Sequence, residues 1–415
     1  MTEAEFASVF KKLTRGKELT GNDPTSWQWR LFHEHFTVGN FPSVIDLPTG
    51  LGKTMVMALW LIAWAHKNSL PRRLVYVVDR RTVVDQATDL ATALRDNAPA
   101  ALPGIANLAV STLRGQLADN RDWTRDPSRP AIIIGTVDLI GSALLFSGYR
   151  SSYKRRPLEA GLLGQDSLLV LDEAHLSKPF EKLICAIGEG GSFQKNRDDN
   201  MPDMPMRVIR MSATSGQSGG VMPSFTLQLE KNGDLKGDDA KDSIAEARFN
   251  AKKRLTITTL GDKENLNTKL TDAAIELAQK PDFCGKRIVV FVRSPDDARV
   301  VAEKIRNHAK PAKSKSNPDS VELLTGTMRG LERDELVEKA VFKDRWLNGE
   351  LDPSDPKNQE PVFLVSTSAG EVGFDLNADH LVGDAAPLDS WIQRLGRVNR
   401  RGKGMANVQV FVEPP

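Results

Sequence analysis

The sequence has few residues of several kinds, and each shortage excludes a class of protein. Only two of the 415 residues are cysteines, and no histidine stands at metal-ligand spacing from either of them. A disulfide framework and a zinc site are therefore unsupported. No apolar run reaches the ~18 residues that a membrane-spanning helix needs, and residues 1–13 lack the pattern of a signal peptide. We therefore expect a cytoplasmic protein with no membrane contact.

The chain also lacks an excess of charge of one sign. Lysine and arginine number 56, and aspartate and glutamate number 54. Any surface that binds nucleic acid must therefore be local. The 40% of hydrophobic and 27% of charged residues are typical of a globular protein. A length of 415 residues predicts two domains of about 200 residues each.

The glycines of residues 46–54 predict a phosphate-binding loop. Residues 43–47 are typical of a short buried strand, and residues 55–66 are typical of a helix. Glycines between a strand and a helix let backbone N–H groups approach an anion, and the helix N-terminus adds partial positive charge. Lys53 can then reach the β- and γ-phosphates of ATP, and Thr54 supplies a hydroxyl for Mg²⁺. The other loop residues expected to bind ATP are Thr49, Gly50, Leu51 and Gly52.

Two features beside the loop matter for ATP binding. Leu47 stands where the general pattern has glycine or alanine, a departure that concerns the tightness of the turn. Gln28 lies upstream among aromatic residues, and its amide both donates and accepts, so we expect it to bind the adenine edge. The neighbouring Trp27, Trp29 and Phe32 fit a hydrophobic core about equally well.

An acidic pair follows the apolar strand at residues 168–171. Asp172 is suited to hold Mg²⁺, while Glu173 orients and deprotonates the attacking water. A further strand at 206–211 leads into Ser212 and Thr214, whose hydroxyls are expected to hydrogen-bond the acidic pair. Arg80 and Thr136 also follow predicted strands, at the sheet edge where ligands of α/β folds bind. The repeated alternation of strand and helix predicts a parallel sheet covered on both faces.

The second half repeats this pattern without a second phosphate loop. Residues 215–251 are rich in glycine, serine and charge, which predicts the junction of a domain at 1–250 and another at 251–415. Near the C-terminus, Arg397 and Arg400 share one helical face if their segment is helical. They are then expected to neutralise charge on the γ-phosphate. Taken alone, this segment fits a solvated basic helix better.

Together these segments resemble the motif series of DEAH-type superfamily 2 helicases. The motifs are the phosphate loop, Asp172-Glu173-Ala174-His175, Ser212-Ala213-Thr214 and residues 393–400. The resemblance spans residues 28–401, and it implies two RecA-like lobes, each a doubly wound parallel α/β sheet, with the ATP site in the cleft between them. It also implies a catalytic role for Gln393, an ATP contact at Asp375, and coupling through Ser212 and Thr214. Nucleic-acid contacts are implied at Arg80, Thr136 and Thr367.

Several short segments narrow the resemblance. Residues 47–54, 135–138 and 324–329 are similar to the helicase part of the CRISPR-associated helicase-nuclease of type I systems, and residues 78–82 and 324–329 look most like its type I-G (I-U) branch. The resemblance implies recruitment by an RNA-guided effector complex and association with an HD nuclease. None of the six histidines is directly followed by aspartate, so we expect the nuclease on another portion or polypeptide.

The function expected from all of this is an ATP-dependent 3′ to 5′ translocase or helicase on single-stranded DNA, with ATP and Mg²⁺ as cofactors. The motor of a restriction system and an RNA helicase remain alternatives, because the ATP motifs do not choose the strand. A binding module that uses ATP only as a clamp is the alternative of another class. The basic segments 153–156 and 310–315 have no assigned role.

Overall fold

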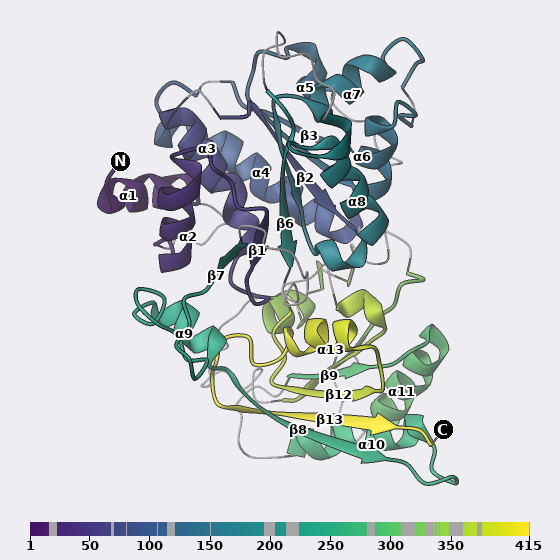
Figure 1. Ribbon diagram of the computed structural model, residues 1–415. Helices are drawn as coiled ribbons and strands as arrows, with labels where there is room; N and C mark the ends of the chain where they lie inside the picture. Colours follow the sequence, from purple (N-terminus) through teal and green to yellow (C-terminus); the bar gives the residue numbers. More distant parts are fainter. Residues whose placement is uncertain are drawn as a thin grey trace. The chain divides into compact units, whose positions relative to one another are not determined.

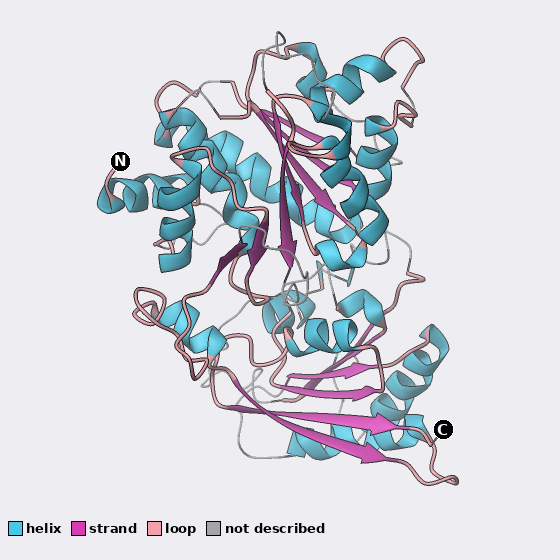
Figure 2. Ribbon diagram, viewed as in Figure 1, coloured by secondary structure: helices cyan, strands magenta, loops and turns pink. Residues whose placement is uncertain are grey.

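The computed structural model forms two compact units, Met1–Glu246 and Ala247–Pro415. It describes residues 1–15, 23–67, 70–79, 81–105, 107–113, 121–149, 151–194, 204–212, 224–279, 287–308, 320–328, 332, 335–336, 338–339, 341–347, 360–371 and 376–414. Each unit is built on a parallel sheet flanked by helices (Figures 1 and 2). Among the described residues, no helix has the length and apolarity needed to cross a bilayer.

The first unit contains a seven-stranded sheet of order β3-β4-β2-β5-β6-β1-β7, and all its strand pairs are parallel. The strands are β1 (Val44–Asp46), β2 (Arg73–Val78), β3 (Ala109–Leu113), β4 (Ala131–Thr136), β5 (Ser167–Leu171), β6 (Arg207–Ser212) and β7 (Ser224–Thr226). The central strands β2, β4 and β5 are buried along their whole length, because helices cover both faces. Their apolar runs are what made them recognisable in the sequence.

Helices cover the first sheet on both sides (Figure 1). Side chains of α6, α7 and α8 join one continuous core with the strands on one face. α1, α3 and α4 pack together on the other face, and α3 is buried around its whole circumference from Val56 to Ala63. The helices of the first unit are α1 (Glu3–Leu13), α2 (Ser26–Leu31), α3 (Val56–His66), α4 (Arg81–Ala101), α5 (Asp122–Arg125), α6 (Val137–Leu144), α7 (Arg156–Gly164) and α8 (Lys178–Ile187). α9 (Ser243–Phe249) spans the boundary between the two units.

The boundary between the two units lies at Glu246, near the end of the segment in which the sequence predicted the junction. β7 extends the sheet by pairing with β1, and the first unit continues to Glu246. This part of the segment is fixed by backbone pairing and by buried polar groups such as Asp239, and not by apolar periodicity.

The second unit contains a six-stranded parallel sheet of order β10-β11-β9-β12-β13-β8. Its strands are β8 (Lys252–Thr259), β9 (Arg287–Phe291), β10 (Val321–Leu324), β11 (Val362–Ser366), β12 (His380–Asp384) and β13 (Met405–Val412). α10 (Leu266–Gln279) and α11 (Pro295–His308) form one core with the sheet, and α13 (Leu388–Leu395) packs on another. The parallel α/β architecture predicted from the sequence is confirmed in both units, although β3, β7, β8 and β10 were not predicted.

Candidate functional site

The phosphate-loop residues follow β1 directly. Gly50 and Gly52 have φ values of 90° and 76°, which side chains other than glycine rarely adopt. A short 3-10 helix (Lys53–Met55) then leads into α3. Lys53 is buried, and its Nζ donates to the carbonyl of Leu47 at 3.2 Å. Leu47, which stands where the general pattern has glycine or alanine, therefore contributes its backbone carbonyl to the loop. Its side chain lies in the core.

The acidic pair lies beside this lysine at the end of β5. The Lys53 ammonium is 3.8 Å from Oε1 of Glu173. Glu173 has a left-handed φ of 46°, and its N–H donates to Oδ1 of Asp172 at 3.0 Å. The Asp172 N–H donates to the carbonyl of Val77 at 2.9 Å, which fixes the pair against β2. The structure thus brings Lys53, Asp172 and Glu173 together, as their places at one edge of a parallel sheet predict.

Tyr76 is a member of this site that the sequence did not reveal. Its hydroxyl donates to Oδ2 of Asp172 at 2.8 Å and also interacts with the Thr54 side chain. Burial and the charge of Asp172 raise the pKa of Tyr76 well above its usual value, so the hydroxyl keeps its proton and remains a donor. A tyrosine inside a fully buried strand needs a polar partner, which is the only signal that could have drawn attention to it.

The residues present fit a magnesium ion. The Thr54 side chain and the Asp172 carboxylate both interact with the Tyr76 hydroxyl. Their oxygens therefore lie near the same place in the site. A hydroxyl and a carboxylate are hard oxygen ligands of the kind that Mg²⁺ prefers, with nucleotide phosphates completing the set. Burial and the charge of Glu173 raise the pKa of Asp172 to about 6, against the opposing effect of Lys53. A divalent cation would stabilise the charged form of this carboxylate.

His175 connects the acidic pair to β6. Its Nδ1 lies 3.5 Å from Oε2 of Glu173 and 3.3 Å from Oγ of Ser212. Ser212 was expected to hydrogen-bond the acidic pair itself, and the structure adds His175 as a link between them. Thr214 lies outside the described residues.

Gln28 lies beside the phosphate loop. Its Oε1 accepts from the Thr25 N–H at 2.9 Å, and its amide nitrogen is 3.7 Å from the point that a Cβ on Gly52 would occupy. Trp27 and Phe32 are almost completely buried, so these two aromatic residues belong to the core. Of the residues in this segment, Gln28 is the one that reaches the loop.

Of the two predicted nucleic-acid contacts in the first unit, only Thr136 is described. It ends β4, is paired in register with Val78 of β2, and starts α6. Its position at the carboxyl edge of the sheet is the one expected from the sequence. Arg80 lies outside the described residues.

In the second unit, the arginine segment is not helical throughout, a point that the sequence left open. α13 ends at Leu395, so Arg397 and Arg400 do not share a helical face. The chain turns away because Val398 forms a bridge with Ala378 and Asn399 adopts a left-handed φ of 47°. The Arg400 N–H donates to a side chain, Oδ1 of Asn377, at 3.0 Å.

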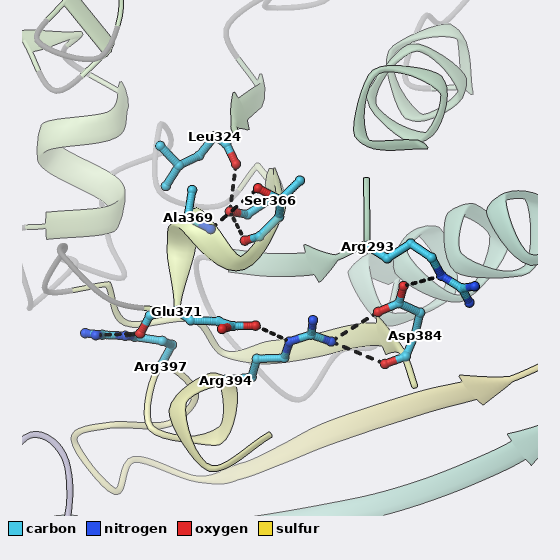
Figure 3. A network of polar contacts seen from close by, with 9 residues as sticks. Arg293, Leu324, Ser366, Ala369, Glu371, Asp384, Arg394 and Arg397 are labelled. Atoms are coloured by element: carbon cyan, nitrogen blue, oxygen red, sulfur yellow. Dashed lines mark hydrogen bonds and ion pairs between the residues drawn. The ribbon is translucent and has the colours of Figure 1, made fainter. Parts of the chain in front are cut away.

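Arg397 and Arg394 both bind the residue Glu371, from different sides (Figure 3). Nε and Nη2 of Arg397 donate to the Glu371 carbonyl at 2.9 and 2.8 Å. Nε of Arg394 donates to the Glu371 carboxylate at 2.9 Å, and its Nη1 donates to Oδ1 of Asp384 at 3.2 Å. Arg293 donates to the other oxygen of Asp384 at 3.3 Å. Arg394, to which the sequence assigned no role, is therefore the buried centre of this network.

The other predicted residues of the second unit are buried or lie outside the described part. Gln393 is buried on α13. Thr367 is buried after β11, where its Oγ1 accepts from the Gly326 N–H at 3.3 Å and its own N–H donates to the Leu324 carbonyl at 3.1 Å. Thr367 thus joins Leu324 and Gly326 to the end of β11. Asp375 lies outside the described residues.

A cavity of about 390 Å³ lies elsewhere in the second unit, over β10. Its charged lining residues are Arg299, Arg306, Lys339, Glu322, Glu332 and Glu335. Equal numbers of opposite charges give this cavity no preference for an anion, so we do not assign it to the nucleotide.

Two family models match the chain, one in each half. Residues 24–214 match the res subunit of type III restriction enzymes, and residues 284–403 match the C-terminal part of the CRISPR-associated nuclease/helicase Cas3. The chain is 23% identical over 257 residues to the CRISPR-associated helicase Cas3 of Thermoproteus tenax, a match that covers 60% of this chain and 34% of that protein. Both halves are thus similar to parts of larger proteins.

Solved structures give the fold. The structure is similar to that of T. fusca Cas3 with ATP, at a TM-score of 0.58 and 16% identity, over 98% of this chain and 47% of that one. It is also similar to the Mycobacterium smegmatis helicase Lhr bound to single-stranded DNA and AMP-PNP, at a TM-score of 0.56 and 17% identity, over 94% of this chain and 46% of that one. The chain has the fold of a superfamily 2 helicase. In this fold, each parallel sheet with its flanking helices is a RecA-like lobe, as the sequence predicted.

The similarity to Cas3-type helicases is also confirmed at the level of sequence, by the family model and by the T. tenax relative. The type I-G branch stays a prediction. The chain spans about a third of the length of that relative and about half of the two structural neighbours.

Proposed function

We propose that this chain is an ATP-dependent translocase or helicase that moves 3′ to 5′ on single-stranded DNA and acts in type I CRISPR interference. The observation that carries the proposal is the arrangement of Lys53, Asp172 and Glu173 around the end of β5. An ammonium for phosphates, a carboxylate for Mg²⁺ and a second carboxylate for the attacking water are the groups that ATP hydrolysis requires.

Each residue has a defined task in this proposal. Lys53 binds the phosphates, and Thr54 and Asp172 would hold Mg²⁺, which neutralises charge on the phosphate oxygens. Glu173 accepts the proton of the attacking water, and His175 keeps its carboxylate oriented. Arg397 and Arg400 are assigned to the γ-phosphate, and Gln393 and Asp375 to the same site, on the strength of their motif. Thr49, Gly50, Leu51 and Gly52 supply the loop backbone.

The nucleic-acid partner is part of the proposal. Thr136 ends β4 and Thr367 directly follows β11, and both are assigned to the DNA backbone together with Arg80. The same proposal includes an RNA-guided effector as partner, an HD nuclease outside this chain and membership of the type I-G branch. It also sets the domain limits at 1–250 and 251–415. The match to a restriction-enzyme model keeps the motor of a restriction system as a second candidate.

ATP hydrolysis with single-stranded DNA, RNA or no nucleic acid tests the proposal. We expect stimulation by DNA, and we expect Glu173→Gln to lower kcat by ~100-fold because the base is lost. A fluorescent ATP analogue should still bind this variant, since Lys53, Thr54 and Asp172 are intact. Glu189→Gln, at an exposed position paired with Arg207, is the matched control. Normal hydrolysis by the Glu173 variant contradicts its role, and stronger stimulation by RNA contradicts the choice of DNA.

A further inference from the structure

The N-terminal end of α2 is tied to a segment more than 200 residues away. The Ser26 hydroxyl donates to Oδ1 of Asp239 at 2.7 Å, and the Ser26 N–H donates to Oδ2 of Asp242 at 2.8 Å. One turn later, Nη2 of Arg30 donates to Oδ2 of Asp239 at 2.9 Å. Two residues of the same short helix therefore converge on Asp239.

Asp239 is fully buried, and its charge is compensated. Besides Ser26 and Arg30, it accepts from the backbone N–H of Gln228 at 2.8 Å. A buried carboxylate is tolerated only when it is paired and hydrogen-bonded, and such groups fix geometry strongly because every alternative position leaves a charge unpaired. Asp239 is therefore a rigid anchor for the helix.

The same anchor reaches the strand next to the phosphate loop. Arg30 also donates to the carbonyl of Thr226 at 2.7 Å, and its guanidinium lies 4.2 Å from the ring centre of Phe225. Both partners belong to β7, which pairs in register with β1. Since β1 leads into the phosphate loop, the anchor fixes α2 relative to that loop.

Gln28 sits between the two anchored residues. It lies on α2, with Ser26 before it and Arg30 after it, and its amide nitrogen faces Gly52. We propose that Asp239 is a positioning residue for the nucleobase, which holds α2 so that Gln28 meets adenine and the site prefers ATP to GTP. This inference rests on the proposed function, which assigns the base to Gln28. Nothing in the sequence around residue 239 indicated such a role, because its partners lie so far away.

Replacing the carboxylate by an amide tests the inference. Asp239→Asn keeps the shape and removes the charge that holds Arg30. We expect its affinity for ATP to fall about tenfold, the effect of one misplaced hydrogen bond to the base, with little change for GTP. Binding of fluorescent ATP and GTP analogues measures the ratio of the two affinities directly. In hydrolysis assays KM for ATP should rise while kcat stays within about twofold, because the reacting groups are untouched.

Two further variants keep the test decisive. Ser26→Ala removes only the hydroxyl that binds Asp239, and it carries the test if the Asp239 variant does not fold. Asp238→Asn is the matched control, because this neighbouring aspartate is exposed and pairs with Lys241. We expect a smaller loss of ATP preference for Ser26→Ala and none for Asp238→Asn.

Three results would overturn the inference. The first is a folded Asp239→Asn or Ser26→Ala variant that keeps the wild-type preference between ATP and GTP. The second is a folded variant that binds both nucleotides equally more weakly, as expected for a purely structural residue. The third is an unchanged preference in Gln28→Ala. Gln28→Ala separates this failure from that of the proposed function. If Gln28→Ala loses the ATP preference while Asp239→Asn keeps it, only the inference fails. If Gln28→Ala keeps the preference, the base assignment itself fails and the inference with it.

Discussion

Asp172 holds a proton more readily than an exposed aspartate does, because burial and the charge of Glu173 raise its pKa to about 6. Only its carboxylate form could bind the Mg²⁺ that the proposed function assigns to it, so protons would compete with the ion. Tyr76 acts against this competition by donating to Oδ2, which lowers the pKa of Asp172. The tyrosine thus keeps the carboxylate available near neutral pH.

A pH titration of nucleotide binding tests this role. As the pH falls through the pKa of Asp172, Mg²⁺-dependent affinity should weaken by up to ~10-fold per pH unit, because one proton displaces the ion. Tyr76→Phe removes the donor and should raise the pKa, so the weakening should begin at a higher pH. Fluorescent nucleotide binding with Mg²⁺ or with EDTA measures both profiles. Tyr149→Phe, at an exposed tyrosine, is the control, and identical profiles for Tyr76→Phe and wild type would contradict the role.

At the scale of elements, the sequence predicted the strands that are buried along their whole length. β2, β4 and β5 show continuous apolar runs because both their faces are covered. β8 was missed because it is an exposed edge strand, held by eight residue pairs with β13 and not by burial. Backbone pairing of this kind leaves no trace in side-chain pattern.

The candidate site was predictable where it depends on order along the chain. Lys53, Asp172 and Glu173 each follow a strand, and parallel strands end at one edge. Tyr76 and Arg394 were missed because their roles depend on which strand or loop lies next to them. Whether the arginine segment is helical could not be read from the sequence, since the bridge between Val398 and Ala378 that diverts it is a long-range contact.

The network around α13 leads to a prediction about two arginines. Arg394→Ala leaves the carboxylates of Glu371 and Asp384 buried without their main partner. The free energy of unfolding should therefore fall by ~3–5 kcal/mol. Arg397→Ala removes hydrogen bonds to one backbone carbonyl, so we expect the free energy of unfolding to fall by only ~1–2 kcal/mol. DNA-stimulated hydrolysis by the Arg397 variant should nevertheless fall by ~10³-fold, if the residue neutralises the γ-phosphate.

Urea unfolding and ATPase assays on the two variants measure these effects. Arg299→Ala serves as the control, because this arginine is exposed and pairs with Asp296 one turn earlier in α11. A larger loss of stability for Arg397→Ala than for Arg394→Ala would show that the buried network is assigned to the wrong arginine.

At the scale of the whole molecule, the two units occupy successive stretches of the chain, and each matches a different family model. The matched relatives are longer, so this chain shares only part of their length. Activities of those longer proteins need not all reside here. The nuclease is the clearest case.

We expect the purified chain to hydrolyse ATP with single-stranded DNA and to leave the DNA uncut with Mn²⁺, Co²⁺ or Ni²⁺. None of its six histidines is directly followed by an aspartate, and the described residues contain no group of three histidine, cysteine or carboxylate side chains placed to hold a metal ion. A metal pair for cleavage needs such a cluster. Cleavage that stays with the protein at constant specific activity through successive columns, and that a substitution in this chain abolishes, would contradict the prediction.

The bond between Ser26 and Asp239 joins residues 213 positions apart, and this distance has a consequence for synthesis. A ribosome releases the phosphate loop and the glutamine helix early, but β7 and Asp239 emerge only when the first unit is almost complete. Domains generally fold as units while the chain grows, and contacts of long sequence separation form slowly. If Asp239 positions the base as inferred, a site able to select its nucleotide can arise only after residue 239 has left the ribosome, when more than half of the chain has been made.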